Sequence, residues 1–467
     1  MRIEHRLFRG LVALLAVRFA SPAGADLPVT GHDVPALRDV DDAVQEFMAD
    51  HDIQCGLVGI MRNGVIVYQR GFGWMNEAQT LEMQDNAVVR LASGTKAITA
   101  AAARTLEADG LLSPSDYVFS SFRGDGAGII DVEPFLTTPA NYDSRHGDIT
   151  VEMCIQHRAG WDYTVEDAVF LNCEISAEMG VDSPPAVDES IAWLIGRPLQ
   201  FTPNAGYAYS NSSYMVLGRV VEVVSGRDIV TYHRSRVLTP DMWVPATDLL
   251  LGESFFEDKQ VREPWYEHHS TTPCVYARDG FDACDPDHEV PSCYGGWDMA
   301  TYFGSGGIIA SAATMLELAE RYELPFGEPK PTGYRPNGGK SGNMSGCTSY
   351  TVQRSDGVNA FVFFNEQNTG AGAIDFYNGT LKAIFDGMAA GDWPTTDVGG
   401  FWVDPEVVWS WTQYGSYDIP FGDVDNALWF LADGSRVNFH PGTSSWTGTL
   451  STKLLLKAPL GSVVIGG

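Results

Sequence analysis

Two residues three positions apart are the first combination in this chain that could do chemistry. Ser93 and Lys96 directly precede an alanine-rich segment. A serine hydroxyl is a weak nucleophile near neutral pH and needs a neighbouring base to take its proton. Because positions i and i+3 share one face of a helix, Lys96 can point at the Ser93 hydroxyl if the serine begins that helix. The alternative is a serine that caps a helix beside a solvated lysine.

The segment that must position this pair is residues 97–109, which have high helix propensity and are apolar on most faces. We therefore predict a buried helix that ends at Gly110. The positive end of its dipole would favour an oxyanion that develops near Ser93. Lys96 can act as a base there if burial or a neighbouring positive charge lowers its pKa.

Two further short motifs follow in the chain. Tyr209–Asn211 reads Tyr-Ser-Asn and starts 116 residues after Ser93, and Lys340–Gly342 reads Lys-Ser-Gly and starts 131 residues after Tyr209. The Lys340 charge can lower the pKa of Lys96, and we expect it to lower the pKa of the Tyr209 phenol as well. The chain has seven lysines and one S-x-x-K segment. The ordered set of three motifs is therefore far more specific than any one of them.

The three motifs and their flanks resemble the β-lactamase-related serine hydrolases, which include class C β-lactamases, DD-peptidases, D-aminopeptidases and family VIII carboxylesterases. Residues 156–161 are similar to the family segment L-x-H-T-S-G-L, residues 209–218 to Y-S-N-x-G-Y-x-L-L-G, and residues 304–311 to A-G-G-L-x-S-T. The resemblance covers roughly residues 40–388.

This resemblance implies an α+β fold of the β-lactamase/transpeptidase type, in which helices flank an antiparallel sheet and an all-helical subdomain is attached. Residues 56–60 and 68–73, with a turn at 62–64, predict the first hairpin of that sheet. His157 lies in a family segment that usually shapes the helical subdomain, so we expect it to be structural. His268 and His269 have no partner spacing that would indicate a metal site.

The resemblance also implies a role for each motif residue. Ser93 would be the acylated nucleophile, Lys96 its hydrogen-bonded activator, and Tyr209 the group that passes the proton to the leaving group and later helps to activate water. The substrate-binding residues would be Asn211, Lys340, Ser341, Gly342 and Asn343. Asn211 would orient the acyl arm and Lys340 would contact a substrate carboxylate, while the backbone N–H groups of Ser93 and Asn343 would form the oxyanion hole.

These assignments predict a secreted serine hydrolase that cleaves an ester, an amide or a β-lactam through an acyl-enzyme on Ser93. The alternatives are a penicillin-binding-like protein that is acylated with little turnover, a D-amino-acid-specific peptidase, and a lectin-like module on an inactive relative. The intact motif residues argue against an inactive relative. The chain has no G-x-S-x-G, H-E-x-x-H, C-x-x-C or Walker segment, and Glu166 lacks the spacing of a class A base. We predict a small-molecule or peptide substrate and no cofactor.

Composition bounds the remaining possibilities. The chain has 467 residues and a formal net charge of −30, which argues against binding to nucleic acid or to anionic membranes. Residues 1–25 combine three early arginines, a short apolar run and an Ala-Gly-Ala site, which predicts a signal peptide and a periplasmic or secreted protein. The apolar run is too short to span a membrane. We assign residues 26–388 to the hydrolase domain.

Seven cysteines in an exported chain predict some disulfides, with one thiol left over. Cys274, Cys284 and Cys293 lie in an acidic loop between the tyrosine and lysine motifs, a region that walls the substrate cleft in relatives. We interpret this loop as disulfide-stapled and solvated. A calcium site with oxygen ligands is the alternative, although no metal ligand is predicted.

The composition shifts after Phe385, and we predict a small C-terminal β module over residues 389–467. This segment holds six of the twelve tryptophans and several turn sequences. The apolar runs 427–431 and 453–456 are interpreted as strands. We expect the aromatic residues to form the core of the module or its contact with the neighbouring domain, with a sugar-binding platform as the alternative.

Overall fold

The computed structural model describes residues 27–238, 240–367, 372–407, 414–431, 433 and 435–465. Residues 1–25, the predicted signal peptide, lie outside the described residues. Within the described ranges, no helix combines the length and the apolar character that crossing a membrane requires.

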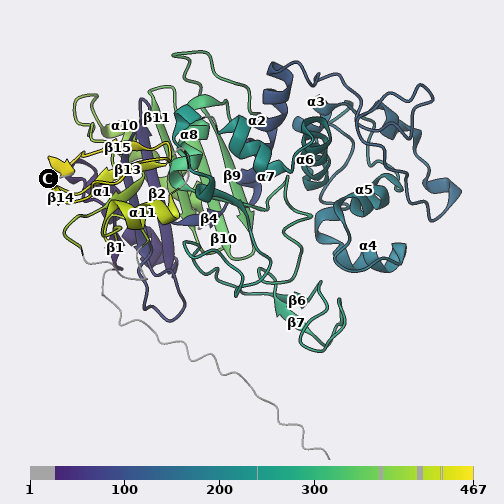
Figure 1. Cartoon of the computed structure of the whole chain (residues 1–467). Coiled ribbons are helices and arrows are strands. Elements are labelled where there is room, and N and C mark those ends of the chain that lie inside the picture. Colours follow the sequence, from purple (N-terminus) through teal and green to yellow (C-terminus); the bar gives the residue numbers. More distant parts are fainter. Residues whose placement is uncertain are drawn as a thin grey trace, which may run out of the picture.

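A six-stranded antiparallel sheet forms the centre of the structure (Figure 1). Its order is β1-β3-β2-β11-β10-β9, with bounds β1 Val29–Thr30, β2 Cys55–Arg62, β3 Val65–Gly73, β9 Gly338–Met344, β10 Cys347–Gln353 and β11 Val358–Phe364. The pair β2–β3 confirms the predicted hairpin, and its turn residues Asn63 and Gly64 have φ values of 50° and 81°. Two positive φ values in succession are typical of a tight hairpin turn, which explains the Asn-Gly sequence.

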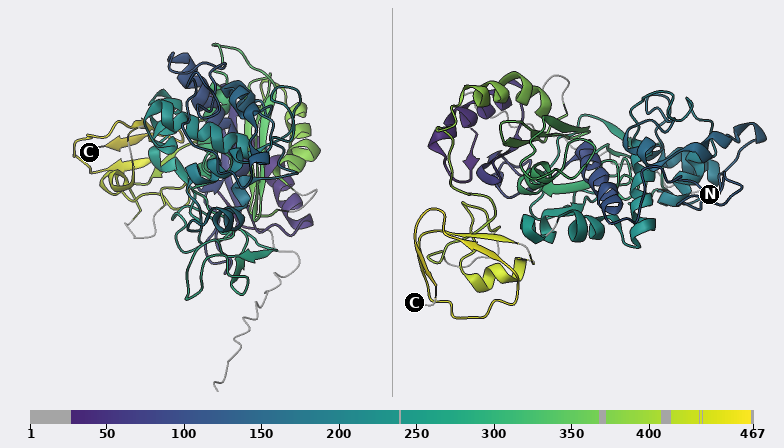
Figure 2. Two further views of the ribbon diagram at one scale, coloured as in Figure 1. Left: turned by 90° about the vertical axis from the view of Figure 1, so that its right-hand side faces the viewer. Right: turned by 90° about the horizontal axis from the view of Figure 1, so that it is seen from above.

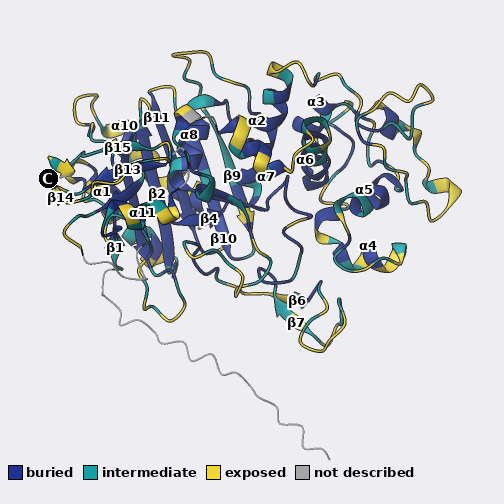
Figure 3. Ribbon diagram, viewed as in Figure 1, coloured by how far each residue is buried: buried dark blue, intermediate teal, exposed yellow. Residues whose placement is uncertain are grey.

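Helices cover both faces of this sheet (Figures 1 and 2). The helices α1 (Arg38–Asp50), α9 (Ala373–Phe376) and α10 (Lys382–Gly387) share one core with Val58 and Ile60 of β2. The helix α8 (Ala312–Arg321) shares the other core with Leu57 and Met61. Because β2 is buried on both faces, its sequence is apolar almost throughout rather than alternating. Figure 3 shows the central strands as buried.

In the sequence, the helical subdomain comes after β4 (Val88–Arg90) and before β8 (Ile308–Ser311). Its helices are α2 Thr95–Ala108, α3 Val151–Ile155, α4 Asn172–Met179, α5 Val187–Ile195, α6 Asn211–Ser225 and α7 Ile229–Tyr232. The strands β4, β8 and β5 (Leu249–Leu251) form a small antiparallel sheet, and β6 (Thr271–Pro273) pairs with β7 (Glu289–Pro291). Sheet and subdomain together confirm the expected α+β arrangement.

The helix α2 confirms the predicted buried helix, although it starts two residues earlier, at Thr95. It ends as expected: Gly110 has a φ of 72°, and the Leu111 N–H donates to the Leu106 carbonyl at 3.0 Å. The alanines between positions 97 and 103 are fully buried, and their small side chains let α6 pack closely against α2.

In its described residues, the C-terminal segment folds as a mixed module of strands and one helix. The strands β12 (Phe401–Val403), β13 (Arg436–Phe439) and β15 (Leu455–Lys457) form a parallel sheet, and β14 (Gly442–Ser444) pairs with β16 (Val463–Ile465). The run 453–456 contributes to β15 as expected. The strand interpretation of 427–431 is wrong, because most of this run belongs to α11 (Val424–Phe430). The Asp423 side chain accepts the Asn426 N–H and caps this helix.

The module lies beside the rest of the chain (Figure 2) and contacts the loops that follow β1 and precede β4. The Gly31 N–H donates to the Asp418 carboxylate at 2.6 Å, and the Tyr417 N–H donates to Asp85 at 3.3 Å. Asp85 is buried, and burial together with the Asp418 charge raises the pKa of its carboxyl to about 7. The interface therefore contains a carboxyl group that binds its proton more tightly than usual.

The described tryptophans of this segment take different positions. Trp402 is fully buried, and Trp393 packs against Phe385 of α10 with ring centroids 5.6 Å apart. Trp429 is 84% exposed. Trp409 and Trp411 lie outside the described residues. Core formation and docking thus account for Trp402 and Trp393, as expected.

One disulfide joins Cys173 at the start of α4 to Cys284 in the loop between β6 and β7. The loop is stapled as expected, but its partner comes from the helical subdomain and not from the loop itself. The other cysteines are buried thiols: Cys55, Cys154, Cys274, Cys293 and Cys347. In the part of the chain that the structure describes, no group of three or more His, Cys, Asp or Glu side chains could hold a metal ion.

Candidate active site

Ser93 lies in a short 3-10 turn, Ala92–Gly94, that leads directly into α2. The preceding residue, Ala92, has a φ of 47°, a left-handed conformation that costs free energy for a residue with a side chain. The Nζ atom of Lys96 lies 3.1 Å from the Ser93 Oγ, and the Lys96 side chain is completely buried. The structure thus brings the predicted nucleophile and activator into hydrogen-bond distance.

The other contacts of Lys96 determine how its amine can work. Nζ donates to the Asn211 Oδ1 and to the Ser305 carbonyl, each at 2.6 Å. Both of these oxygens can only accept hydrogen bonds, so they occupy the two N–H groups of a neutral amine and leave its lone pair toward Ser93. Burial, followed by the Lys340 charge, lowers the pKa of Lys96 well below its usual range. A lowered pKa favours the neutral amine, which is the form that a general base needs.

Tyr209 lies close to both lysines. Its ring centroid is 5.0 Å from the Lys96 Nζ and 4.8 Å from the Lys340 Nζ. Burial raises the pKa of the Tyr209 phenol, and its hydrogen bond with Ser93 offsets only part of that rise. The pKa is not lowered as expected, because removal of the phenol from water dominates and Lys340 is not among the groups that act on it most strongly. The phenol stays protonated near neutral pH and can donate a proton.

The third motif lies on β9, which passes directly over the turn that carries Ser93. A Cβ atom at Gly342 would lie 1.9 Å from the Leu91 carbonyl oxygen, so only glycine allows this approach. The Ser349 hydroxyl on the neighbouring strand β10 donates to the same carbonyl at 2.7 Å. On β9, the Asn343 Oδ1 accepts from the Gln367 side chain at 2.6 Å. The oxyanion hole formed by the backbone N–H groups of Ser93 and Asn343 stays a prediction.

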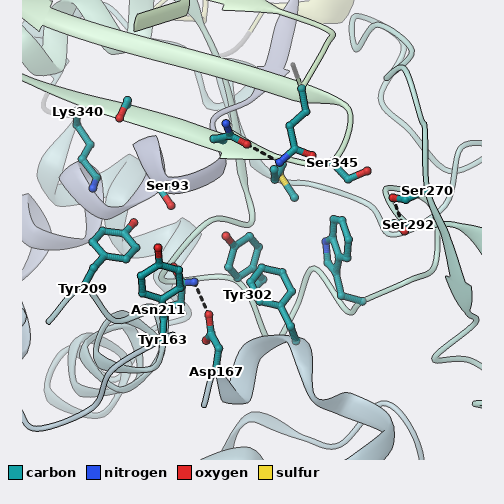
Figure 4. Close-up of a pocket in the computed structure, with 16 residues that line it drawn as sticks. Ser93, Tyr163, Asp167, Tyr209, Asn211, Ser270, Ser292, Tyr302, Lys340 and Ser345 are labelled. Carbon is teal, nitrogen blue, oxygen red and sulfur yellow. Dashed lines mark hydrogen bonds between the residues drawn. The ribbon is translucent and has the colours of Figure 1, made fainter. Parts of the chain in front are cut away.

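These motif residues open into a cavity of about 790 Å³ (Figure 4). Its lining includes Ser93, Tyr209, Asn211, Lys340, Ser341 and Asn343. The insert between the tyrosine and lysine motifs adds Ser270, Ser292 and Trp297, as expected from the resemblance. Tyr163 and Phe170 contribute an aromatic surface from the segment before α4. None of the described residues of 401–465 lines this cavity.

Sequence reasoning missed two groups of the site. The Ser305 carbonyl binds Lys96 through the backbone, so its contact depends only on the path of the chain. Asp167 lines the cavity and accepts a 2.6 Å hydrogen bond from the Asn211 Nδ2. Burial raises the pKa of its carboxyl to about 6. Ser305 lies in the family-like segment 304–311, but nothing in that segment indicates a contact with Lys96, and Asp167 belongs to no motif.

His157 has the structural role expected for it. Its Nδ1 accepts the Ser210 N–H at 3.2 Å, and its ring lies 4.5 Å from the Tyr209 ring, between centroids. Burial and the charges of Lys340 and Lys96 lower its pKa to about 3. A neutral imidazole can accept this bond and so fixes the backbone that carries Tyr209.

Comparison with protein-family models assigns the chain to a family. The model described as Beta-lactamase matches residues 40–378. The chain belongs to the β-lactamase family. The D-amino acid amidase from Ochrobactrum anthropi SV3, solved as a complex with D-phenylalanine, has a similar structure. The TM-score is 0.51 at 16% sequence identity, covering 74% of this chain and 99% of that one. This similarity confirms the β-lactamase/transpeptidase-like fold.

Two curated proteins are related in sequence to this β-lactamase-family chain. Protein flp of Staphylococcus aureus (strain MW2) is 23% identical over 256 residues, which cover 52% of this chain and 44% of flp. Esterase EstB of Burkholderia gladioli is 29% identical over 191 residues, which cover 40% of this chain and 45% of EstB. The chain therefore spans less than half the length of either relative.

Proposed function

We propose that this chain is a serine hydrolase that works through an acyl-enzyme on Ser93. The observation that carries the proposal is the buried amine of Lys96, whose two N–H groups have acceptors in Asn211 and Ser305 and whose lone pair is left for Ser93. A solvated lysine beside a helix cap, the alternative interpretation, would have neither the burial nor the two acceptors.

The contacts suggest the order of proton transfers. As the Ser93 Oγ attacks the substrate carbonyl carbon, Lys96 takes the hydroxyl proton. The Tyr209 phenol then donates its proton to the leaving group as the bond to the carbonyl carbon breaks, and Lys96 returns a proton to Tyr209. Attack of water on the acyl-enzyme reverses this path: Tyr209 takes the water proton as it passes its own to Lys96, and Lys96 gives that proton to the Ser93 Oγ as the acid leaves.

The reacting bond is an ester, an amide or a β-lactam. Lys340 and Ser341 line the cavity and offer hydrogen-bond donors to a substrate carboxylate. This supports acyl donors that carry a carboxylate near the scissile bond. A penicillin-binding-like protein would use the same acylation and differ in the lifetime of the acyl-enzyme, while a D-amino-acid-specific peptidase would differ in the acyl group it accepts.

The first experiment tests the nucleophile. A labelled fluorophosphonate should modify Ser93 and no other serine, as shown by intact mass and peptide mapping, and the Ser93→Ala variant should not be labelled. Label on another serine would remove the basis of the proposal. Burst kinetics on p-nitrophenyl esters, D-amino-acid p-nitroanilides and a chromogenic β-lactam then separate turnover from stoichiometric acylation and rank the three bond types.

We further propose that the protein is exported, with residues 1–25 as signal peptide, residues 26–388 as the hydrolase domain and residues 389–467 as the C-terminal module. The disulfide between Cys173 and Cys284 supports an oxidising compartment such as the periplasm or the extracellular space. N-terminal sequencing of protein secreted from an expression host would test the cleavage site. A mature chain that still contains residue 25 would contradict the proposed site.

A further inference from the structure

A continuous chain of hydrogen bonds runs from Asp167 to the catalytic amine. The Asp167 Oδ2 accepts from the Asn211 Nδ2 at 2.6 Å, and the Oδ1 of the same amide accepts from the Lys96 Nζ at 2.6 Å. Lys96 in turn lies 3.1 Å from the Ser93 Oγ. Figure 4 shows Asp167 below Asn211, on the side of the cavity away from Lys340.

This arrangement leaves the Asn211 amide one orientation. An asparagine side chain has a donor end and an acceptor end of nearly the same shape, so its direction depends on its partners. A carboxylate can only accept, which means that Asp167 must receive the NH₂ end of Asn211. The oxygen of Asn211 is then turned toward Lys96, where it takes up one N–H of the amine.

We propose that Asp167 is a positioning residue of the hydrolase: its carboxylate orients the Asn211 amide, and its negative charge stabilises the Lys96 ammonium against the opposing charge of Lys340. This inference rests on the proposed function, because it concerns the base of that reaction. The ionisable groups that interact with Lys96 are Asp167, Tyr209, Tyr214, Lys340 and His157, the last of which is neutral. Among them, Asp167 raises the pKa of Lys96, whereas Lys340 lowers it.

The size of the charge effect follows from the bonds. Two hydrogen bonds of 2.6 Å with one amide between them place the carboxylate within about 8 Å of the Lys96 Nζ. For an effective dielectric constant of about 20–40, unit charges at that distance change the pKa of Lys96 by about 0.8–1.5 units. Asp167 is ionised above its raised pKa of about 6. In that range, removal of its charge should make the neutral amine available at lower pH.

Two variants separate charge from orientation. Asp167→Asn keeps the size and an acceptor oxygen but removes the charge, and Asp167→Ala removes both. With the full-length chain and an uncharged p-nitrophenyl ester, we expect the acid limb of the kcat/KM profile to move to lower pH by about one unit in both variants. Asp167→Ala should in addition lower the plateau about five- to tenfold, the value of one hydrogen bond that aligns the amide.

Several outcomes would overturn the inference. An acid limb that stays at the wild-type pH in a folded variant, checked by circular dichroism, would show that the Asp167 charge does not reach Lys96. Because both variants lack the charge, either one that folds decides this. Normal acylation followed by accumulation of acyl-enzyme would instead mean that Asp167 acts on the hydrolytic water. A wild-type chain that fluorophosphonate does not label at Ser93 would refute the proposed function itself, regardless of the pH at which the acid limb of kcat/KM lies.

Discussion

Replacement of Lys340 by glutamine should move the same acid limb in the opposite direction. The Lys340 charge is the largest contribution after burial to the lowered pKa of Lys96. Without it, the Lys96 ammonium loses its proton less readily, so the neutral amine appears only at higher pH. The enzyme should therefore lose activity on the acidic side while its plateau at higher pH is affected much less.

The structure gives a lower bound for this shift. The two ammonium nitrogens lie 5.0 Å and 4.8 Å from the centroid of the Tyr209 ring, so they cannot be more than about 10 Å apart. For an effective dielectric constant of about 20–40, their repulsion is then at least about 0.8–1.7 kcal/mol, which corresponds to about 0.6–1.2 pH units. Burial lowers the pKa of Lys340 itself to about 8, so the effect applies below that pH, where Lys340 is charged.

The assay is the pH dependence of kcat/KM for an uncharged p-nitrophenyl ester, which has no carboxylate whose binding could change with Lys340. Lys340→Arg is the matched control, since it keeps a positive charge at all relevant pH values. We expect the acid limb to rise by at least 0.6 units in Lys340→Gln and to stay within a few tenths of the wild-type position in Lys340→Arg. Ser93→Ala supplies the background rate.

A limb that stays in place or moves to lower pH in Lys340→Gln would refute this reasoning. The Lys96 pKa would then depend on burial alone, and Lys340 would serve substrate binding only. Combined with Asp167→Asn, the Lys340→Gln change should bring the limb back toward the wild-type position, because the two removed charges act on the same amine with opposite signs.

Three further predictions concern proton donation, substrate charge and stability. Tyr209→Phe should lower kcat about a hundred- to ten-thousandfold in burst kinetics, because the leaving group loses its proton donor; near-normal turnover would place the donor elsewhere. For a substrate with a free carboxylate, KM should rise as the pH passes about 8 and Lys340 loses its charge, while KM for an uncharged ester stays level. Asp85 has a pKa raised from the usual 3.8 to about 7, so the folded state loses stability as the pH rises from the first value to the second, with no further loss above it. Asp85→Asn should therefore be more stable than the wild type by about 2–4 kcal/mol in urea unfolding at pH 8, and by less at pH 5. An equal stability difference at the two pH values would show that ionisation of Asp85 does not destabilise the folded state.

Much of the site could be predicted because its chemistry is concentrated in short motifs. Ser93 and Lys96 are neighbours on one turn, so their meeting follows from local geometry alone. Gly342 could be recognised from the motif, although the reason for a glycine there, the close approach of β9 to the Leu91 carbonyl, appears only in the structure. The end of α2 was equally local, since Gly110 alone sets it.

The missed features depend on residues far apart in the chain. Asp167 is one of many acidic residues, and only the packing of its loop against α6 brings it to Asn211. Cys284 is bonded to a cysteine 111 positions earlier, which no spacing rule selects among seven thiols. The run 427–431 was assigned to a strand because five apolar residues are too few to separate the two periodicities, and the capping Asp423 decided for the helix.

The strand order of the central sheet constrains when the chain can fold. Arg62 of β2 lies opposite Val358 of β11, so the two halves of the sheet are encoded almost 300 residues apart. Closing so long a loop is entropically costly, and folds rich in such distant contacts form slowly. A growing polypeptide that has not yet reached Phe364 has β3 but lacks β11, the second strand partner of β2, so it holds Ser93 without the completed sheet beside it. Catalytic competence should therefore arise late in synthesis, in a single step, when β9, β10 and β11 join β2 in the central sheet.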